Sequence, residues 1–208
     1  PFKTESAWLT RSPAPTNALP SGYPVSAQGC PSQQGERVYD VAVVTLELQA
    51  PANAKGLGFD FDFWSGEWPD FVCSPFNDAF IALVDGKNVS FDAQGNPVSV
   101  NNGFFDRCTP NTSTGCDPRA TPKTSVCPGG TAELAGTGFD DPGNYCGTQS
   151  AGGGATGWLR SQAPVTPGAK VTLQFVIYEA GDGVLDSSVL IDNFHWIASE
   201  TTTSTTRP

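Results

Sequence analysis

Hydrophobic and polar residues alternate with a period of two in several segments of this chain. The segment 37–51 shows the alternation from Val38 to Leu48 and ends at Pro51. A period of two is typical of a β-strand with one buried face, because successive side chains of a strand point to opposite sides. This segment is therefore predicted to be a long strand.

Three further segments repeat the signal. Residues 56–64 alternate phenylalanine with aspartate, which predicts a strand with one aromatic and one acidic face. Residues 78–92 predict a hairpin, with Asp85 and Gly86 at its turn. The alternation returns over 171–177, and a closing strand is predicted from Val189 onward. No helical pattern or internal repeat interrupts this series.

The segments between and around these predicted strands indicate the domain organisation. Residues 1–37 carry six prolines and predict an extended arm. Residues 93–157 are rich in Gly, Pro, Thr and Asn and hold four of the six cysteines, which predicts a long disulfide-stapled loop excursion. We expect one β domain over 38–198 and a threonine-rich tail or linker over 199–208. The fold prediction is all-β: an antiparallel β-sandwich of jelly-roll type.

Charge excludes some classes of partner. The chain has 11 Lys and Arg against 21 Asp and Glu, a net charge of −10. Such a chain repels nucleic acid phosphates and anionic lipid, so neither is expected as a partner. It has no run of about 20 apolar residues, so no direct membrane insertion is expected. We expect the mature segment of a longer, exported precursor.

The cysteines indicate an oxidising location. Their number is even and no Cys-x-x-Cys pair is present, which favours three disulfides over a zinc site. Pairing of neighbours along the chain gives Cys30–Cys73, Cys108–Cys116 and Cys127–Cys146. The less favoured alternative is a set of reduced, buried cysteines in a cytosolic protein.

Acidic residues gather in two places and predict a structural calcium site. Ca²⁺ takes six to eight oxygen ligands from carboxylates, amides and carbonyls. The first group is Glu67, Asp70, Asn77 and Asp78, and the second is Asp182 and Asp186, with Asp192 further on. Neither group has the regular spacing of a known calcium loop, and the alternative is that both are solvated turns.

Signals for catalysis are weak, and we expect no enzyme. The single histidine, His195, lies between two aromatic residues without a nucleophile motif, so a structural role is expected. Glu67 and Asp70 would be the acid and base of a glycan-active hydrolase, since that reaction needs two carboxyl groups. Paired acids are common in a chain this acidic, so this is the least favoured alternative.

Two stretches resemble a known family. They are FDFWSGEWPDFVCSPFNDAFIALVDG at 61–86 and GWLRSQAPVTPGAKVTLQFVIYEAGDGVLDSSVLIDNFHW at 157–196. Together they are similar to the choice-of-anchor L domain of bacterial secreted and surface proteins, over roughly residues 38–197. The matching positions are Ser65, Glu67, Trp68, Pro69, Asp70, Phe71, Phe76, Asn77, Asp78, Phe80, Asp186 and Ser187. Trp68 stands where the family more often has tyrosine.

The resemblance implies an extracellular or cell-surface domain. We expect a non-catalytic, calcium-stabilised structural or adhesive module that self-assembles into a fibre or layer through its N-terminal arm. Its expected partners are then neighbouring copies of the same chain. The alternative is a carbohydrate-binding module, in which an exposed Trp68 stacks on a sugar ring.

Overall fold

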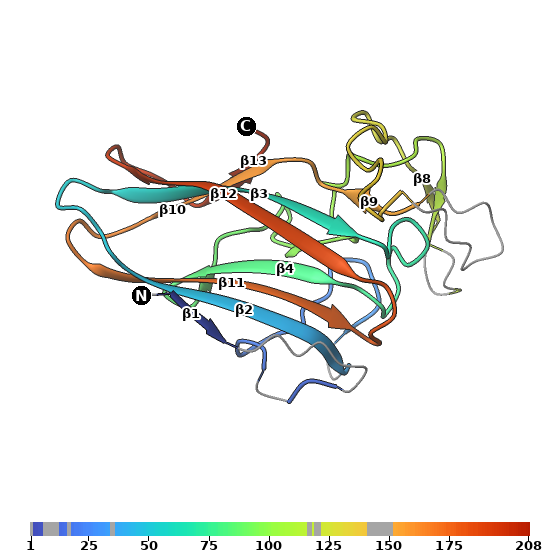
Figure 1. The fold of residues 1–208 in the computed structure, drawn as a ribbon, viewed down its shortest axis with the longest axis horizontal. Coiled ribbons are helices and arrows are strands. Elements are labelled where there is room, and N and C mark those ends of the chain that lie inside the picture. Colours follow the sequence, from blue (N-terminus) through green and yellow to red (C-terminus); the bar gives the residue numbers. More distant parts are fainter. Residues whose placement is uncertain are drawn as a thin grey trace.

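The computed structural model describes residues 2–5, 13–15, 18–33, 36–115, 118, 122–140 and 152–208. Within these ranges the chain forms β-strands and no helix. Two sheets face each other as two layers (Figure 1), and every strand pairing is antiparallel.

The first sheet is built on two long strands, β2 and β11. Its order along the sheet is β1 (Phe2–Glu5), β2 (Val38–Gln49), β11 (Lys170–Ala180), β4 (Ala79–Val84) and β5 (Lys87–Asn88), with β6 (Val98–Ser99) also on β4. Because β11 lies between β2 and β4, the centre of this sheet pairs a late segment of the chain with two earlier ones.

The second sheet is built around β3. Its order is β12 (Ser187–Ile197), β3 (Gly56–Ser65), β10 (Leu159–Pro164) and β13 (Ser204–Thr206), with β9 (Gly154–Ala155) also on β3. A separate hairpin of β7 (Ser113–Thr114) and β8 (Lys123–Thr124) lies in the loop excursion. The predicted all-β sandwich is confirmed, whereas this strand order does not confirm the jelly-roll subtype.

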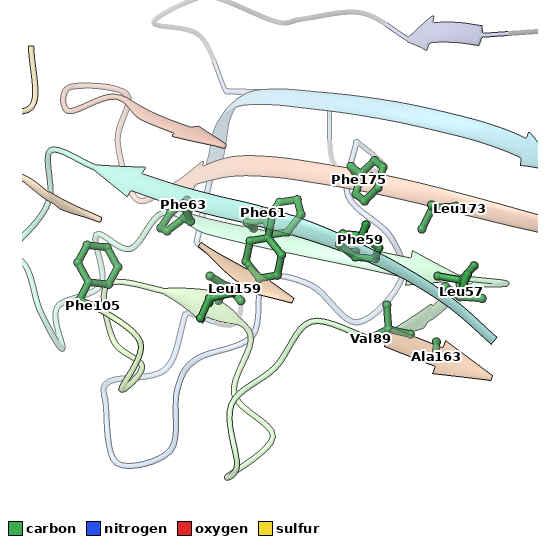
Figure 2. Packing of buried hydrophobic residues seen from close by; sticks show 14 of the residues in the cluster. Leu57, Phe59, Phe61, Phe63, Val89, Phe105, Leu159, Ala163, Leu173 and Phe175 are labelled. Carbon is green, nitrogen blue, oxygen red and sulfur yellow. The ribbon is translucent and has the colours of Figure 1, made fainter. Parts of the chain in front are cut away.

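The core lies between the sheets because the strands alternate as the sequence predicts. Figure 2 shows Phe59, Phe61 and Phe63 along β3, with Phe175 of β11 close to Phe59. The Phe59 and Phe175 ring centroids are 5.0 Å apart in an edge-to-face arrangement. All three β3 phenylalanines are fully buried. At about 25 cal/mol per Å² of buried apolar surface, such side chains contribute roughly 1.5–3 kcal/mol each.

The described part of the N-terminal arm lies on the first sheet of its own chain. β1 pairs with β2 at the sheet edge, with Phe2 opposite Leu46. Further along, the Ala14 amide donates to the Val38 carbonyl at 2.7 Å. Leu19 and Tyr23 pack against the outer face of this sheet. Exchange of the arm with a neighbouring copy stays a prediction.

Two disulfides lie within the described residues, and one of them corrects the predicted pairing. Cys30–Cys73 is confirmed and ties the arm to the loop after β3. Cys108 bonds to Cys127 and not to Cys116, so the predicted pairs Cys108–Cys116 and Cys127–Cys146 are wrong. The β7–β8 hairpin explains this, because its antiparallel pairing brings the segments before and after it side by side. Cys116 and Cys146 themselves lie outside the described residues.

Candidate functional site

At one end of the sandwich the inward-facing positions change from aromatic to acidic. On β3 the buried column runs through Phe61 and Phe63 to Ser65, and Glu67 follows it just beyond the strand. Glu67 is 3% exposed, and its amide donates to the Ser65 Oγ at 3.1 Å. A carboxylate therefore continues the core column of the second sheet.

Two neighbouring strands of the first sheet also have a carboxylate at the end of a core-facing column. The last pair between β4 and β11 places Tyr178 opposite Ala79, so the next residues in that register are Glu179 and Asp78. Side chains directly opposite each other have Cβ atoms about 4.5–5.5 Å apart. Asp78 is 1% exposed and Glu179 is 5% exposed. Two carboxyl groups therefore lie buried side by side.

The turn between β11 and β12 adds further polar groups beside these carboxylates and connects the two sheets. Ser187, the first residue of β12, donates its hydroxyl to Asp78 Oδ2 at 2.5 Å. The Gly66 amide donates to the Asp186 carbonyl at 3.0 Å. Asp182, in the same turn, is half-buried and lines a surface pocket of about 360 Å³ together with Tyr39. We call Glu67, Asp78, Glu179, Asp182 and Asp186 the acidic layer.

Burial and mutual repulsion raise the carboxyl pKa values in the acidic layer. Burial raises the pKa of Asp78 well above its ordinary range, and the charge of Glu67 raises it further. The pKa of Glu67 rises for the same reasons, burial first and then Asp182 and Glu179. Burial, followed by the charge of Asp78, raises the pKa of Glu179 to about 9. Without a counter-charge, these groups therefore favour the protonated form.

Two oxygen atoms of the layer, and one of the neighbouring Asn77, lack a hydrogen-bond donor. Glu67 Oε2, Glu179 Oε2 and Asn77 Oδ1 are all buried and unpartnered. Asn77 is otherwise fixed, because its Nδ2 donates to Gln33 Oε1 at 3.2 Å. Buried acceptors without donors are uncommon in folded proteins, since each costs about 1–3 kcal/mol. A proton or a cation would satisfy them.

Among the described residues, no three acidic, His or Cys side chains already share a metal-binding geometry. A cation in the acidic layer would therefore require side chains to turn toward it. The oxygens are nevertheless supplied by both sheets and by one connecting turn, which is the arrangement needed to surround an ion.

The structure separates the predicted ligands into two sets. Glu67, Asp78, Asp182 and Asp186 come together, although they are up to 119 residues apart in the chain. The Asn77 side chain bonds instead to Gln33. Asp70 is buried on the same loop as Glu67. Asp192 pairs in register with Asp60 and is not part of the layer.

Sequence reasoning missed Glu179, because it lies inside an otherwise apolar strand. The signal was present in the alternation. Phe175 and Ile177 contact the core, and Glu179 is the next residue of the same parity. An acidic residue at a core-facing position needs a partner, which could have assigned it to the predicted ion site.

The other candidate residues take structural positions. The expectation that Trp68 is exposed is wrong, because it is 9% exposed and stacks on Phe105 with centroids 4.9 Å apart. His195 is half-buried, with its Nδ1 2.7 Å from the Asn193 carbonyl. A Cβ on Gly58 would lie 2.9 Å from the His195 ring, so only glycine leaves room for that ring over β3.

The fold and the acidic layer define an all-β sandwich module with a polar end to its core. The sequence pattern of the choice-of-anchor L domain matches residues 27–194, so the chain belongs to the choice-of-anchor L domain family. This membership indicates a surface or secreted module. No curated protein and no solved structure matches the chain. In the described part of the chain, no helix could cross a membrane.

Proposed function

We propose that this domain is a non-catalytic structural or adhesive module of a bacterial surface or secreted protein, stabilised by Ca²⁺ in the acidic layer. The observation that carries the proposal is the pair of buried oxygens without donors, on Glu67 and Glu179, beside the carboxylate of Asp78. Family membership supports the location, and the acidic layer supports the ion.

Calcium suits this set of ligands better than a transition metal. Every candidate ligand offers oxygen, from five carboxylates, and no nitrogen or sulfur ligand joins them. Ca²⁺ prefers such hard oxygen ligands at 2.3–2.6 Å, about six to eight of them, and tolerates irregular geometry. Loop carbonyls and water would complete the shell. The ion would also remove the repulsion that raises the pKa of Glu67 and Asp78.

Protons are the competing occupants of the layer. A protonated carboxyl group can donate to a neighbouring oxygen, and the raised pKa of Glu179 favours its protonated form near neutral pH when no cation is bound. Calcium binding therefore releases protons, and the apparent affinity rises with pH.

Burial of the same carboxyl groups supports a role without catalysis. Glu67 and Asp78 have almost no exposed surface, whereas a glycoside hydrolase needs two carboxyl groups on either side of a bound sugar. A glycosidic bond cannot reach oxygens enclosed in this way, so the acids are suited to hold the two sheets together.

A melting experiment with matched variants tests the calcium proposal. Calcium in large excess should raise the melting temperature above its value in EDTA, because a ligand of the folded state adds roughly 3–4 kcal/mol at 100 to 1,000 times its dissociation constant. Glu179→Gln and Asp78→Asn should lose most of this response.

The control for these variants is Asp62→Asn. Asp62 is also buried, and burial raises its pKa to about 6, but it hydrogen-bonds to Thr156 outside the acidic layer. Its calcium response should stay intact. Identical melting curves in calcium and EDTA for the unmodified chain would overturn the proposal.

A further inference from the structure

A second hollow is lined mainly by the loop excursion and is distinct from the pocket beside Asp182. Its volume is about 520 Å³, and it is lined by the end of the core, the loop after β6 and the β7–β8 hairpin. Ligand pockets commonly have volumes of roughly 300–1,000 Å³. This pocket is therefore large enough for one or two sugar rings.

One wall of the pocket is apolar and tightly packed. The stacked rings of Trp68 and Phe105 form it together with Val100. Gly154 lies against the same rings, and a Cβ there would come within 2.9 Å of both. Carbon–hydrogen faces of a ligand ring would contact this wall.

The polar lining carries donors that lack acceptors. Trp68 Nε1 and Asn101 Nδ2 are buried without a hydrogen-bond partner. The other amide atom of Asn101, Oδ1, is already used, because it accepts from the Cys73 amide at 2.5 Å. With a small side-chain movement, a ligand rich in oxygen acceptors would satisfy both donors.

The pocket is held in shape by bonds on two sides. The Cys108–Cys127 disulfide joins the two segments that lead into and out of the β7–β8 hairpin. Arg207 donates to the Phe104 carbonyl at 2.6 Å and to the Thr156 carbonyl at 2.7 Å, and its guanidinium lies 3.1 Å from Asp106. A preformed pocket loses less entropy on binding than a flexible one.

We propose that this pocket binds a saccharide unit of a neutral glycan. The apolar wall would contact ring carbons, and the unpartnered donors would bind hydroxyl or ring oxygens. A net charge of −10 disfavours a polyanionic glycan. This site goes beyond the calcium-stabilised role and does not rest on it.

Calorimetric titration of the full chain with neutral methyl glycosides and oligosaccharides tests this site. Asn101→Asp removes the free donor and keeps the oxygen that accepts from Cys73. Val126→Arg places a long side chain at the rim, where Val126 is 78% exposed. Each should lower the affinity about tenfold, which corresponds to about 1.4 kcal/mol, because one removes a hydrogen bond to the ligand and the other blocks the rim.

Val184→Arg is the matched control. Val184 is also an exposed valine, 66% exposed, but it lies by the acidic layer, so its substitution should leave the affinity unchanged. The melting temperature of each variant shows whether it still folds. The proposal is overturned if no saccharide binds the unmodified chain, or if folded Asn101→Asp and Val126→Arg both bind as tightly as it does.

Discussion

Three carboxyl side chains, Glu67, Asp78 and Glu179, determine the charge at the polar end of the core. Each extends a column of core-facing positions, and each is almost completely buried. A buried carboxylate is stable only when a proton, a donor or a cation compensates its charge. Ser187 supplies one donor to Asp78, which leaves the remaining oxygens to protons or to an ion.

This balance predicts an unusual pH dependence when calcium is absent. The pKa of Glu179 is about 9 in the folded chain, against an ordinary 4.5. Below about pH 4.5 the group is protonated in both the folded and the unfolded chain. As pH rises from there toward about 9, only the unfolded chain gives up the proton, so the folded chain loses stability.

Melting in EDTA from about pH 5 to about pH 8 checks this dependence. The melting temperature should fall across the range, and saturating calcium should reduce the fall. Glu179→Gln cannot ionise, so its curve in EDTA should be flatter. A melting temperature that rises over the same range in EDTA would contradict the account.

At the scale of elements, the sequence predicted individual strands better than their partners. The alternation over 37–51 and 56–64 corresponds closely to β2 and β3, because a period of two reports which face of a strand is buried. The pairing of β11 between β2 and β4 depends on contacts far apart in the chain, which local pattern does not encode. The bond between Cys108 and Cys127 was missed for the same reason.

The candidate site was also predicted only where local sequence pattern was sufficient. Acidic residues in loops, such as Asp78 and Asp186, were found from composition, because clusters of acids stand out in an apolar stretch. Glu179 was hidden by the strand around it, and the burial of Trp68 was hidden by its loop position. Both depend on packing, since the register of β11 against β4 and the ring of Phe105 set their surroundings.

The edge strand β1 is the part of the arm that could be exchanged between copies of the chain. β1 pairs with β2 through its backbone, and an edge strand can be exchanged for the same strand of another copy. Deletion of residues 1–12 removes β1 but keeps the segment around Leu19 and the Cys30–Cys73 bond. Under exchange, the shortened chain should remain folded and lose its higher-order species in light scattering.

The full-length chain at the same concentration is the reference for this measurement. It should show species larger than a monomer, and the proportion should rise with concentration, because association follows mass action. A full-length chain that stays monomeric at high concentration, or a shortened chain that assembles equally well, would contradict assembly through β1.

At the scale of the whole molecule, the acidic layer lies where several distant parts of the fold meet. Its side chains come from the loop after β3, from the residue before β4, from β11 and from the turn before β12. A bound ion would therefore join both sheets at one end, while disulfides secure the arm and the excursion. An ion at one end together with disulfides in the arm and the excursion would suit a surface module that must stay folded outside the cell.

Calorimetric titration of calcium into the chelator-treated chain tests this central claim most directly. We expect saturable binding of one calcium ion per chain, with protons released in proportion as the carboxyl groups ionise. Binding should be lost in Glu179→Gln and retained in Asp62→Asn. Absence of saturable calcium binding by the folded, unmodified chain, or unchanged binding in Glu179→Gln, would show that the acidic layer is held by protons alone.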